Sequence, residues 1–345
     1  MTYLALIVAF VASILLTPFV KKLAYRIGAV DKPNHRKVHS SVMPRLGGLA
    51  IFIAFLIGIA VAHPMDKSMV AILIGGFVIV ITGALDDMLE ITPKAKLLGQ
   101  LAAALIVIFF GGVQIDFINL PFDGKLTFGY FSIPLTILWI LAITNAINLI
   151  DGLDGLAAGV STIALVTLAG MAFIMSNGFV LVIALILAAS TCGFLFYNFH
   201  PAKIFMGDTG ALFLGFMIAV LSLLGFKNVT FISLVIPIVM LGVPISDTFF
   251  AIVRRLLNKQ PPFSPDKSHL HHRLMSLGFT HRQTVLLIYG IAAMFGVAAV
   301  TFSMATVWGA ILLITVILIA IELFVEAIGL AGQNYRPLLN LVRRK

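Results

Sequence analysis

One short stretch gathers polar residues between two apolar segments: Asn145-Ala-Ile-Asn148-Leu-Ile-Asp151-Gly-Leu-Asp154-Gly155-Leu156. Asp151 and Asp154 are three residues apart, so their carboxylates share one face if the stretch opens a helix. The N–H groups of a helix start favour anions, and an Asp N-cap would account for only one of the two aspartates. Asn145 and Asn148 need hydrogen-bond partners if buried, and a nucleotide base or sugar hydroxyl could supply them. Because charge beside hydrocarbon is expensive, the stretch is predicted to be functional.

Two further acidic motifs stand at the ends of apolar segments. Asp86 and Asp87 are neighbours, which point about 100° apart on a helix, so one could bind a metal or a base while the other faces a substrate. Acid at a helix C-terminus opposes the macrodipole, so capping does not explain the pair. Asp208 is predicted to bind a metal, with N-capping as the alternative. Nearby, Lys203 could meet a phosphate, and Phe205 could stack on a base or pack at the membrane interface.

Basic residues gather in two other segments. In 21–45, Lys37, His39 and Arg45 could contact phosphate, whereas the remaining basic residues are explained by lipid headgroups and membrane topology. The second segment, within 253–283, contains His269-Leu-His271-His272-Arg273. Histidine beside arginine suits a diphosphate. Zinc is the competing ligand because imidazole is its commonest partner, but no cysteine lies near.

Four other features lie outside these motifs. Asp247 could join the site or pair with a buried base, and both readings stay open. Glu322 and Glu326 are expected to meet solvent or neighbouring helices. Residues 114–132 are predicted to form a capping turn or small hairpin. The single cysteine, Cys192, excludes a disulfide framework.

The elements that carry these motifs are hydrophobic segments long enough to cross a bilayer. The 345 residues are 61% hydrophobic and only 11% charged, and the mean hydropathy is +1.11. A soluble domain has about 25% charged residues. We therefore predict an all-α, polytopic transmembrane bundle that forms one integral-membrane domain over 1–345. Its eleven expected spans are 3–20, 46–62, 69–85, 97–113, 133–150, 156–175, 179–197, 210–226, 231–252, 284–304 and 307–326.

The distribution of lysine and arginine predicts the orientation of these spans. If the segment after the first span is cytoplasmic, the cytoplasmic segments hold 20 of the 23 basic residues. The N-terminus is then outside and the C-terminus cytoplasmic. All the motif aspartates fall at the cytoplasmic ends of spans, as do seven of the eight histidines. The motifs are therefore expected to share one cytoplasmic mouth.

Carboxylates that meet a basic loop predict metal-assisted chemistry on phosphates. Carboxylate ligands suit a hard cation, and Mg²⁺ is the usual choice with phosphates. The chain contains no P-loop signature and no dinucleotide-binding glycine motif after a strand. The net charge of +9 is explained by cytoplasmic loops, so no nucleic-acid partner is expected. The sequence predicts Mg²⁺-assisted phosphoryl transfer at the membrane surface.

Taken together, the motifs resemble those of one family. Met43-Pro-Arg-Leu-Gly-Gly, Asp86-Asp87, the 145–156 stretch, Asn198-Phe-His-Pro-Ala-Lys-Ile-Phe-Met-Gly-Asp-Thr-Gly and His269-Leu-His-His-Arg occur in order. They are similar to the cytoplasmic signatures of the polyprenyl-phosphate N-acetylhexosamine-1-phosphate transferases. The histidine loop resembles the bacterial branch that uses UDP-N-acetylglucosamine (UDP-GlcNAc) and undecaprenyl phosphate, and the resemblance covers nearly the whole chain.

The resemblance implies roles for individual residues. Asp208 matches the Mg²⁺ ligand, and Asp86 or Asp87 matches the acid that deprotonates or orients the lipid phosphate. Asp151 and Asp154 match the nucleotide and metal region. The residue patterns and the resemblance together give a substrate-binding set of Asn145, Asn148, Lys203, Phe205, His269, His271, His272, Arg273, Lys37 and Arg45; a metal set of Asp208, Asp86 and Asp151; and a catalytic set of Asp86, Asp87, Asp151 and Asp154.

The resemblance also implies the cofactor, the partners and the cellular setting. Mg²⁺ is expected, with Mn²⁺ as a substitute, in the plasma membrane of a bacterium and in a protein that could form a homodimer. The step would begin wall teichoic acid or a related envelope glycan. Direct attack by the lipid phosphate, releasing UMP, is preferred over a phospho-aspartate intermediate. A MurNAc-pentapeptide transferase and a cation-coupled transporter are the alternatives, although transporters place ionisable groups near the midplane.

Overall fold

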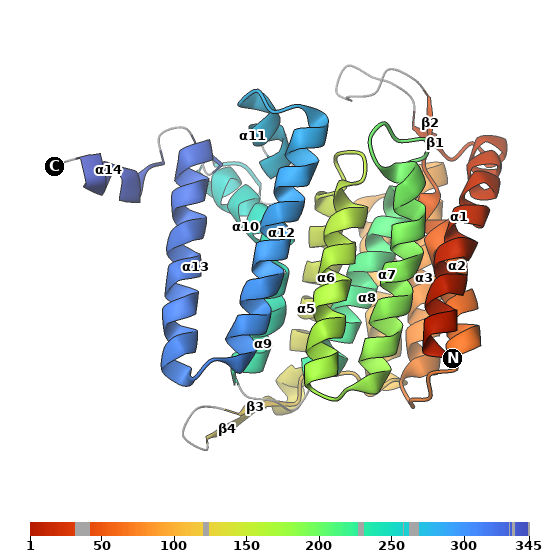
Figure 1. Ribbon diagram of the computed structural model, residues 1–345, viewed down its shortest axis with the longest axis horizontal. Coiled ribbons are helices and arrows are strands. Elements are labelled where there is room, and N and C mark those ends of the chain that lie inside the picture. The colour runs from red at the N-terminus through yellow and green to blue at the C-terminus, as the bar shows by residue number, and fades with distance from the viewer. Residues whose placement is uncertain are drawn as a thin grey trace.

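The structure is a computed structural model that describes residues 1–31, 42–119, 124–226, 231–257, 259–261, 269–330, 332 and 335–343. Long helices run up and down beside one another, with the N-terminus at one end of the bundle and the C-terminus at the other (Figure 1). Of the residues expected in the site, Lys37 lies outside the described residues, as does His39.

The helices and strands follow one another in a simple order (Figure 1). The helices are α1 (Thr2–Ile27), α2 (Gly47–Ala62), α3 (Met69–Leu89), α4 (Pro93–Phe109), α5 (Ser132–Leu149), α6 (Leu156–Ile174), α7 (Gly178–Asn198), α8 (Gly207–Phe226), α9 (Phe231–Met240), α10 (Gly242–Leu257), α11 (Leu270–Ser276), α12 (His281–Met304), α13 (Val307–Ile328) and α14 (Pro337–Arg343). Two short antiparallel pairs join β1 (Val30–Asp31) to β2 (Met43–Pro44) and β3 (Phe117–Asn119) to β4 (Lys125–Thr127). The β3–β4 pair confirms the small hairpin predicted within 114–132.

The helices confirm a multi-pass membrane protein. Within the described residues, eight helices are long and apolar enough to cross a bilayer: α1, α3, α5, α6, α7, α8, α12 and α13. Helix α2 is apolar but shorter. The total of eleven spans and the direction in which they cross the bilayer remain predictions.

The ninth expected span, 231–252, is wrong as one continuous helix. Helix α9 ends at Met240, and α10 begins at Gly242 and runs on to Leu257. Pro237 lies inside α9, where it has no N–H to donate and its ring crowds the preceding turn. The side chain of Phe295 packs so closely on Gly242 that an added Cβ would lie 2.6 Å from its ring. A hydropathy pattern does not detect this break, because the residues on both sides of Leu241 are apolar.

Two other boundaries differ from the expected spans and matter for the site. Helix α3 continues to Leu89, so Asp86 and Asp87 lie in its last turns rather than beyond it. Helix α4 begins at Pro93, four residues before the expected start. Thr92 caps it by accepting the Ala95 N–H at 3.3 Å, and proline suits the first helical turn. A hydropathy pattern does not detect this start, because the first turn of α4 is polar.

Helix α8 forms the centre of the bundle and touches α2, α3, α5 and α6. Its side chains are almost all buried, as expected for a helix that is apolar on every side. Its first turn packs on glycines of two neighbouring helices. A Cβ at Gly83 of α3 would lie 2.5 Å from the Thr209 backbone, and one at Gly48 of α2 would lie 2.0 Å from Gly210 N. These contacts fix the start of α8 against α2 and the end of α3.

We expect Gly83→Ala to destabilise the protein, because its new methyl group would collide with the Thr209 backbone. Overpacking of this kind costs about 1–3 kcal/mol. Gly170→Ala in α6 is the matched control, since a Cβ there meets nothing within 4 Å. Thermal unfolding of both variants in detergent measures the difference. Equal melting temperatures for the two variants would contradict the proposed packing.

Candidate active site

The end of α3, the start of α8 and the segment before α2 meet around one buried carboxylate. Asp87 is fully buried and accepts hydrogen bonds from the N–H groups of Asp208 (2.9 Å) and Thr209 (3.0 Å). The Thr209 hydroxyl donates to it at 2.6 Å, and Arg45 Nε at 3.0 Å. Asp87 therefore caps the start of α8. The expectation that capping does not explain the aspartate pair was wrong for Asp87, because the capped helix is not its own.

Arg45 is held in place by backbone pairing. The Phe205 N–H donates to Pro44 O at 2.8 Å, and the Gly47 N–H donates back to Phe205 O at 3.0 Å. These bonds join the segment before α2 to the segment before α8. They bring Arg45 to Asp87 and, at 3.5 Å from Nη2, to Asp208 Oδ1. Phe205 is half-buried, and its backbone contributes to the site whatever its ring contacts.

Asp86 and Asp208 face each other across a lysine that sequence reasoning missed. Lys96 of α4 reaches Asp86 Oδ2 at 3.0 Å and also pairs with Asp208 Oδ2. Arg45 Nη2 lies 4.0 Å from Asp86. The side chains of Asp86 and Asp208 are 11% and 16% exposed, so a ligand can reach them, unlike that of Asp87. The Thr92-Pro93 helix start, which places Lys96 one turn into α4, was the available sequence signal.

Asp151 lies in the turn between α5 and α6, close enough to interact with this group. Burial, together with the charges of Asp208 and Asp87, raises the pKa of Asp151 to about 8. Asp86, Asp87 and Asp208 carry −3 when ionised, against +2 from Arg45 and Lys96, which leaves a net −1 while Asp151 is protonated and −2 once it ionises. We call Asp86, Asp87, Asp151, Asp208, Arg45 and Lys96 the acidic cluster.

The acidic cluster fits a magnesium ion by the chemistry of its donors. Its carboxylate oxygens are hard ligands, and the excess negative charge would be balanced by a divalent cation. Asp208 and Asp86 are the two members that a ligand can reach and that share a cationic partner. Mg²⁺ is commonly held by one or two carboxylates plus substrate phosphates, so a complete protein cage is not required.

Asp154 belongs to a different group. Its carboxylate accepts from the Ala202 N–H at 3.1 Å and pairs with His200 Nδ1 at 2.7 Å. Its own N–H donates to His281 Nε2 at 3.0 Å, and the two imidazoles stack at 4.2 Å. Asp154 thus ties the α5–α6 turn to the 200–202 loop and to the start of α12.

The ligand atoms of Asp154, His200 and His281 lie within 4.8 Å of one another, which is close enough to consider a metal. The ring geometry argues against it. The imidazole planes are tilted by only 22°, so their in-plane lone pairs do not converge on one nearby point. The His281 lone pair already accepts the Asp154 N–H. We therefore interpret this group as a structural tie between three segments.

The two asparagines differ in their surroundings. Asn145 Nδ2 donates to Gln100 Oε1 and to Leu141 O, both at 2.7 Å, so much of its amide is engaged inside the bundle. Asn148 is half-buried, and its backbone carbonyl accepts the Asp151 N–H at 3.2 Å. Asn148 therefore lies next to the acidic cluster, whereas Asn145 braces α5 against α4. Lys203 is exposed, with its ammonium 5.7 Å from the Tyr197 ring centre.

The histidine motif docks through Asp247, whose role the sequence left open. Asp247 pairs with His269 Nδ1 at 2.9 Å and accepts the Leu270 N–H at 2.7 Å. His271 is buried against the turn that carries Asp151, where a Cβ at Gly152 would lie 2.4 Å from His271 Nε2. Burial lowers the pKa of His271 to about 3, and the nearby His272 adds to the effect. His271 is therefore neutral at pH 7.

Arg273 does not point to the same place as His271. It lines a separate pocket with Arg336, between α11 and the C-terminal helices. Two positions along a helix correspond to about 200° of rotation, which explains the separation. The structure thus brings Asp86, Asp87, Asp151, Asp208 and Arg45 together, and places His271 beside their turn. Asp154, Asn145, Lys203 and Arg273 lie outside this group.

Comparisons with known proteins all find transferases. The model of the family described as Glycosyl transferase family 4 matches residues 69–226, from the start of α3 to the end of α8. The chain is 49% identical to a probable undecaprenyl-phosphate N-acetylglucosaminyl 1-phosphate transferase of Bacillus subtilis (strain 168), over 98% of this chain and 96% of the relative. It is 36% identical to a decaprenyl-phosphate N-acetylglucosaminephosphotransferase of Mycobacterium leprae (strain TN), over 86% and 83% of the two chains. An undecaprenyl-phosphate alpha-N-acetylglucosaminyl 1-phosphate transferase of Escherichia coli (strain K12) is 30% identical, over 84% and 80%.

The roles of the neighbouring aspartates can be separated by stability. Asp87→Ala should lower the free energy of unfolding by about 3–5 kcal/mol, because it leaves Arg45 and the start of α8 without their buried partner. Asp86→Ala is the matched control, since Lys96 keeps its pair with Asp208. Thermal unfolding of the two variants in the same detergent tests this. A larger loss in Asp86→Ala would refute the assignment.

Proposed function

Because this chain belongs to glycosyl transferase family 4, we propose that it transfers N-acetylglucosamine 1-phosphate from UDP-GlcNAc to undecaprenyl phosphate. The observation that carries the proposal is the 49% identity to the Bacillus subtilis relative over nearly the full length of both chains. The acidic cluster supports it, since it combines carboxylates and cations at the ends of four apolar helices.

In the proposed reaction, the lipid phosphate replaces UMP as the group joined to the β-phosphate of the nucleotide sugar. An oxygen of the lipid phosphate attacks the β-phosphorus of UDP-GlcNAc and forms a new P–O bond. The bond from that phosphorus to the bridging oxygen breaks, and UMP leaves with the electron pair. The products are UMP and undecaprenyl diphosphate bearing N-acetylglucosamine. Catalysis then depends on positioning and on neutralising charge.

Within the acidic cluster, the geometry supports different tasks for the two neighbouring aspartates. Asp87 is enclosed and fully engaged in capping α8, so it positions the other groups. Asp86 is accessible and is the member of the pair suited to orient the lipid phosphate or accept its proton. Lys96 and Arg45 lie where they could neutralise phosphate oxygens. Mg²⁺, held by Asp208 with Asp86 or Asp151, would supply charge neutralisation at the diphosphate.

The nucleotide sugar would lie between the α5–α6 turn and the histidine helix. Asn148 and Phe205 are placed beside the acidic cluster and could contact the uridine. His271 of α11 packs on the same turn, and His269 and His272 lie beside it in the chain, so the three histidines could contact the sugar and diphosphate. Lys203 and Lys37 remain candidates for phosphate contacts, the latter outside the described residues.

We further propose that the acidic cluster faces the cytoplasm of a bacterial cell. The excess of lysine and arginine on that side supports this orientation, as do the termini at opposite ends of the bundle. The product would begin wall teichoic acid or a related envelope glycan, and a homodimer is a reasonable assembly. Radiolabelled transfer from each UDP-sugar would distinguish this activity from MurNAc-pentapeptide transfer.

Lys96 and Lys94 offer a matched pair for testing the acidic cluster. Both lie at the start of α4, but Lys94 is exposed, whereas Lys96 pairs with Asp86 and Asp208. Lys96→Gln should lower the transfer rate by about 10²-fold or more, the usual cost of losing a positioned charge. Lys94→Gln should stay near wild type. Radiolabelled product formation in detergent measures both rates, and equal losses would mean that only general surface charge matters.

Removing the metal should stop transfer without unfolding the protein. A chelator should abolish product formation from UDP-GlcNAc and undecaprenyl phosphate, and Mg²⁺ added in excess should restore it. The melting temperature should change little, because Arg45 and Lys96 already neutralise part of the acidic cluster. Full activity after exhaustive chelation would rule out the metal.

A further inference from the structure

A polar pocket lies away from the acidic cluster, between α11 and the C-terminal helices. Its volume is about 790 Å³. Helix α11 contributes one wall, the last turn of α13 another, and α14 with the residue before it the third. The lining residues are Arg273, Ser276, Leu277, Ala327, Ile328, Gly329, Arg336 and Asn340. We call it the arginine pocket.

The arginine pocket carries two positive charges and no acid in its lining. The Nε atoms of Arg273 and Arg336 are both enclosed, and neither has a hydrogen-bond partner among the described residues. By contrast, Arg45 Nε in the acidic cluster donates to Asp87 at 3.0 Å. An enclosed N–H without an acceptor is costly, and the planar fork of a guanidinium matches phosphate oxygens. The pocket is therefore complementary to a phosphate group.

Both arginines are held in place by contacts of the elements that carry them. Glu326 of α13 is fully buried and accepts the N–H groups of Leu338 (2.7 Å) and Leu339 (2.8 Å). This contact fixes the start of α14, directly after Arg336. Arg273 is fixed because α11 is docked through Asp247 and His271 on its other side. The two guanidinium groups are thus set by different elements around one space.

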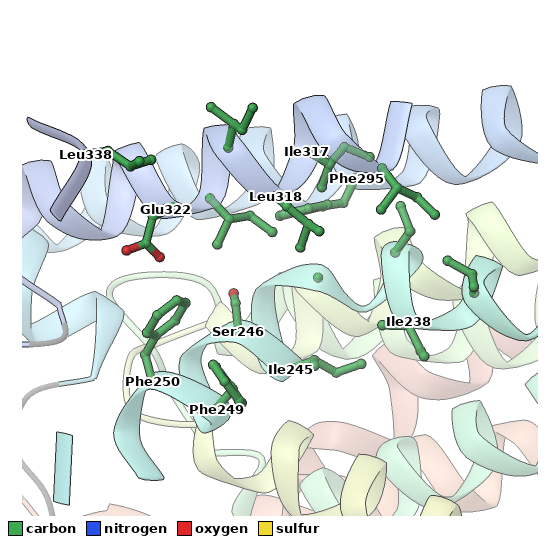
Figure 2. Close-up of a pocket in the computed structure, with 16 residues that line it drawn as sticks. Ile238, Ile245, Ser246, Phe249, Phe250, Phe295, Ile317, Leu318, Glu322 and Leu338 are labelled. Atoms are coloured by element: carbon green, nitrogen blue, oxygen red, sulfur yellow. The ribbon is translucent and has the colours of Figure 1, made fainter. Parts of the chain in front are cut away.

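The surroundings favour a lipid as the source of the phosphate. Helix α13 is a candidate membrane span with few buried side chains, and the arginine pocket lies at its C-terminal end. Basic pockets at the ends of membrane helices bind anionic headgroups. An apolar groove of about 560 Å³ begins one to two turns before the arginine pocket on α13, toward the N-terminus of that helix. It lies between α9–α10 and α12–α13 (Figure 2).

The groove and the arginine pocket share α14 as a wall. Leu338 and Glu322 stand at one end of the groove, and the remaining labelled side chains, apart from Ser246, are apolar (Figure 2). Asn340 of α14 and Arg336, the residue before α14, line the arginine pocket instead. A phospholipid has a phosphate headgroup and apolar acyl chains. The arginine pocket suits the first, and the apolar groove beside it suits the second. We propose that the arginine pocket binds the phosphate of an anionic phospholipid and thereby joins α11 to the C-terminal segment.

The test is lipid retention by the purified full-length protein. The protein is exchanged into nanodiscs of phosphatidylcholine with a minor share of phosphatidylglycerol, re-extracted, and its bound lipid is quantified. Wild type should retain phosphatidylglycerol in preference to phosphatidylcholine. Arg336→Gln should weaken that retention about tenfold or more, as expected for one charge-assisted contact. Arg26→Gln is the matched control, since Arg26 is an exposed arginine at the end of α1.

A second variant tests the pocket through a substitution at an exposed position, where misfolding is not expected. Ser276 is exposed and lines the pocket, so Ser276→Glu should fold while placing a negative charge beside the arginines. It should lower phosphatidylglycerol retention as Arg336→Gln does. Equal retention in all variants, or equal losses in Arg336→Gln and Arg26→Gln, would overturn the proposal.

Competition separates a lipid headgroup from a soluble phosphate. Inorganic phosphate and UDP-GlcNAc, added during re-extraction, should leave the bound phosphatidylglycerol in place. Displacement of phosphatidylglycerol by either one, in wild type and in the Arg26→Gln control alike, would assign the pocket to a soluble ligand and contradict the lipid. Because the readout is bound lipid, failure here leaves the proposed transferase activity unaffected.

Discussion

The hydrogen bonds between Asp87 and the start of α8 hold the candidate site together. A buried carboxylate at the end of one membrane helix caps the first turn of another, and the same carboxylate binds Arg45 from a third segment. The positive end of the α8 dipole favours this charge, and so does the guanidinium. Asp208 stands in that first turn, so its position depends on the bond.

This arrangement separates positioning from chemistry. Asp87 is enclosed and cannot meet a substrate, whereas Asp86 and Asp208 are reachable and share Lys96. Glycines allow the three backbones to approach closely, because any side chain at Gly48 or Gly83 would overlap the start of α8. The Asp154 tie and the Asp247 tie then bring α12 and α11 to the same end of the bundle. Close backbone packing thus places charged side chains that apolar helices alone could not orient.

Much of the fold followed from the sequence, because long apolar runs in a membrane protein have few alternatives to helices. The break at Leu241 did not, since a hydropathy pattern does not respond to a turn between two apolar helices. In the site, the aspartate motifs were visible as charges in hydrocarbon. Their partners were not: Lys96, His281 and Gln100 are ordinary residues until tertiary contacts bring them to Asp86, Asp154 and Asn145. The same limit explains why Arg273 was grouped with histidines that face another direction.

In the proposed reaction, the acidic cluster would hold a divalent cation against the diphosphate of UDP-GlcNAc. Mn²⁺ substituted for Mg²⁺ allows this to be measured by electron–nuclear double resonance, as a coupling between the metal and the ³¹P nuclei of the bound nucleotide sugar. We expect a ³¹P coupling in wild type and in Asp154→Asn, and its loss in Asp208→Asn. A coupling that survives in Asp208→Asn, or that disappears only in Asp154→Asn, would contradict it.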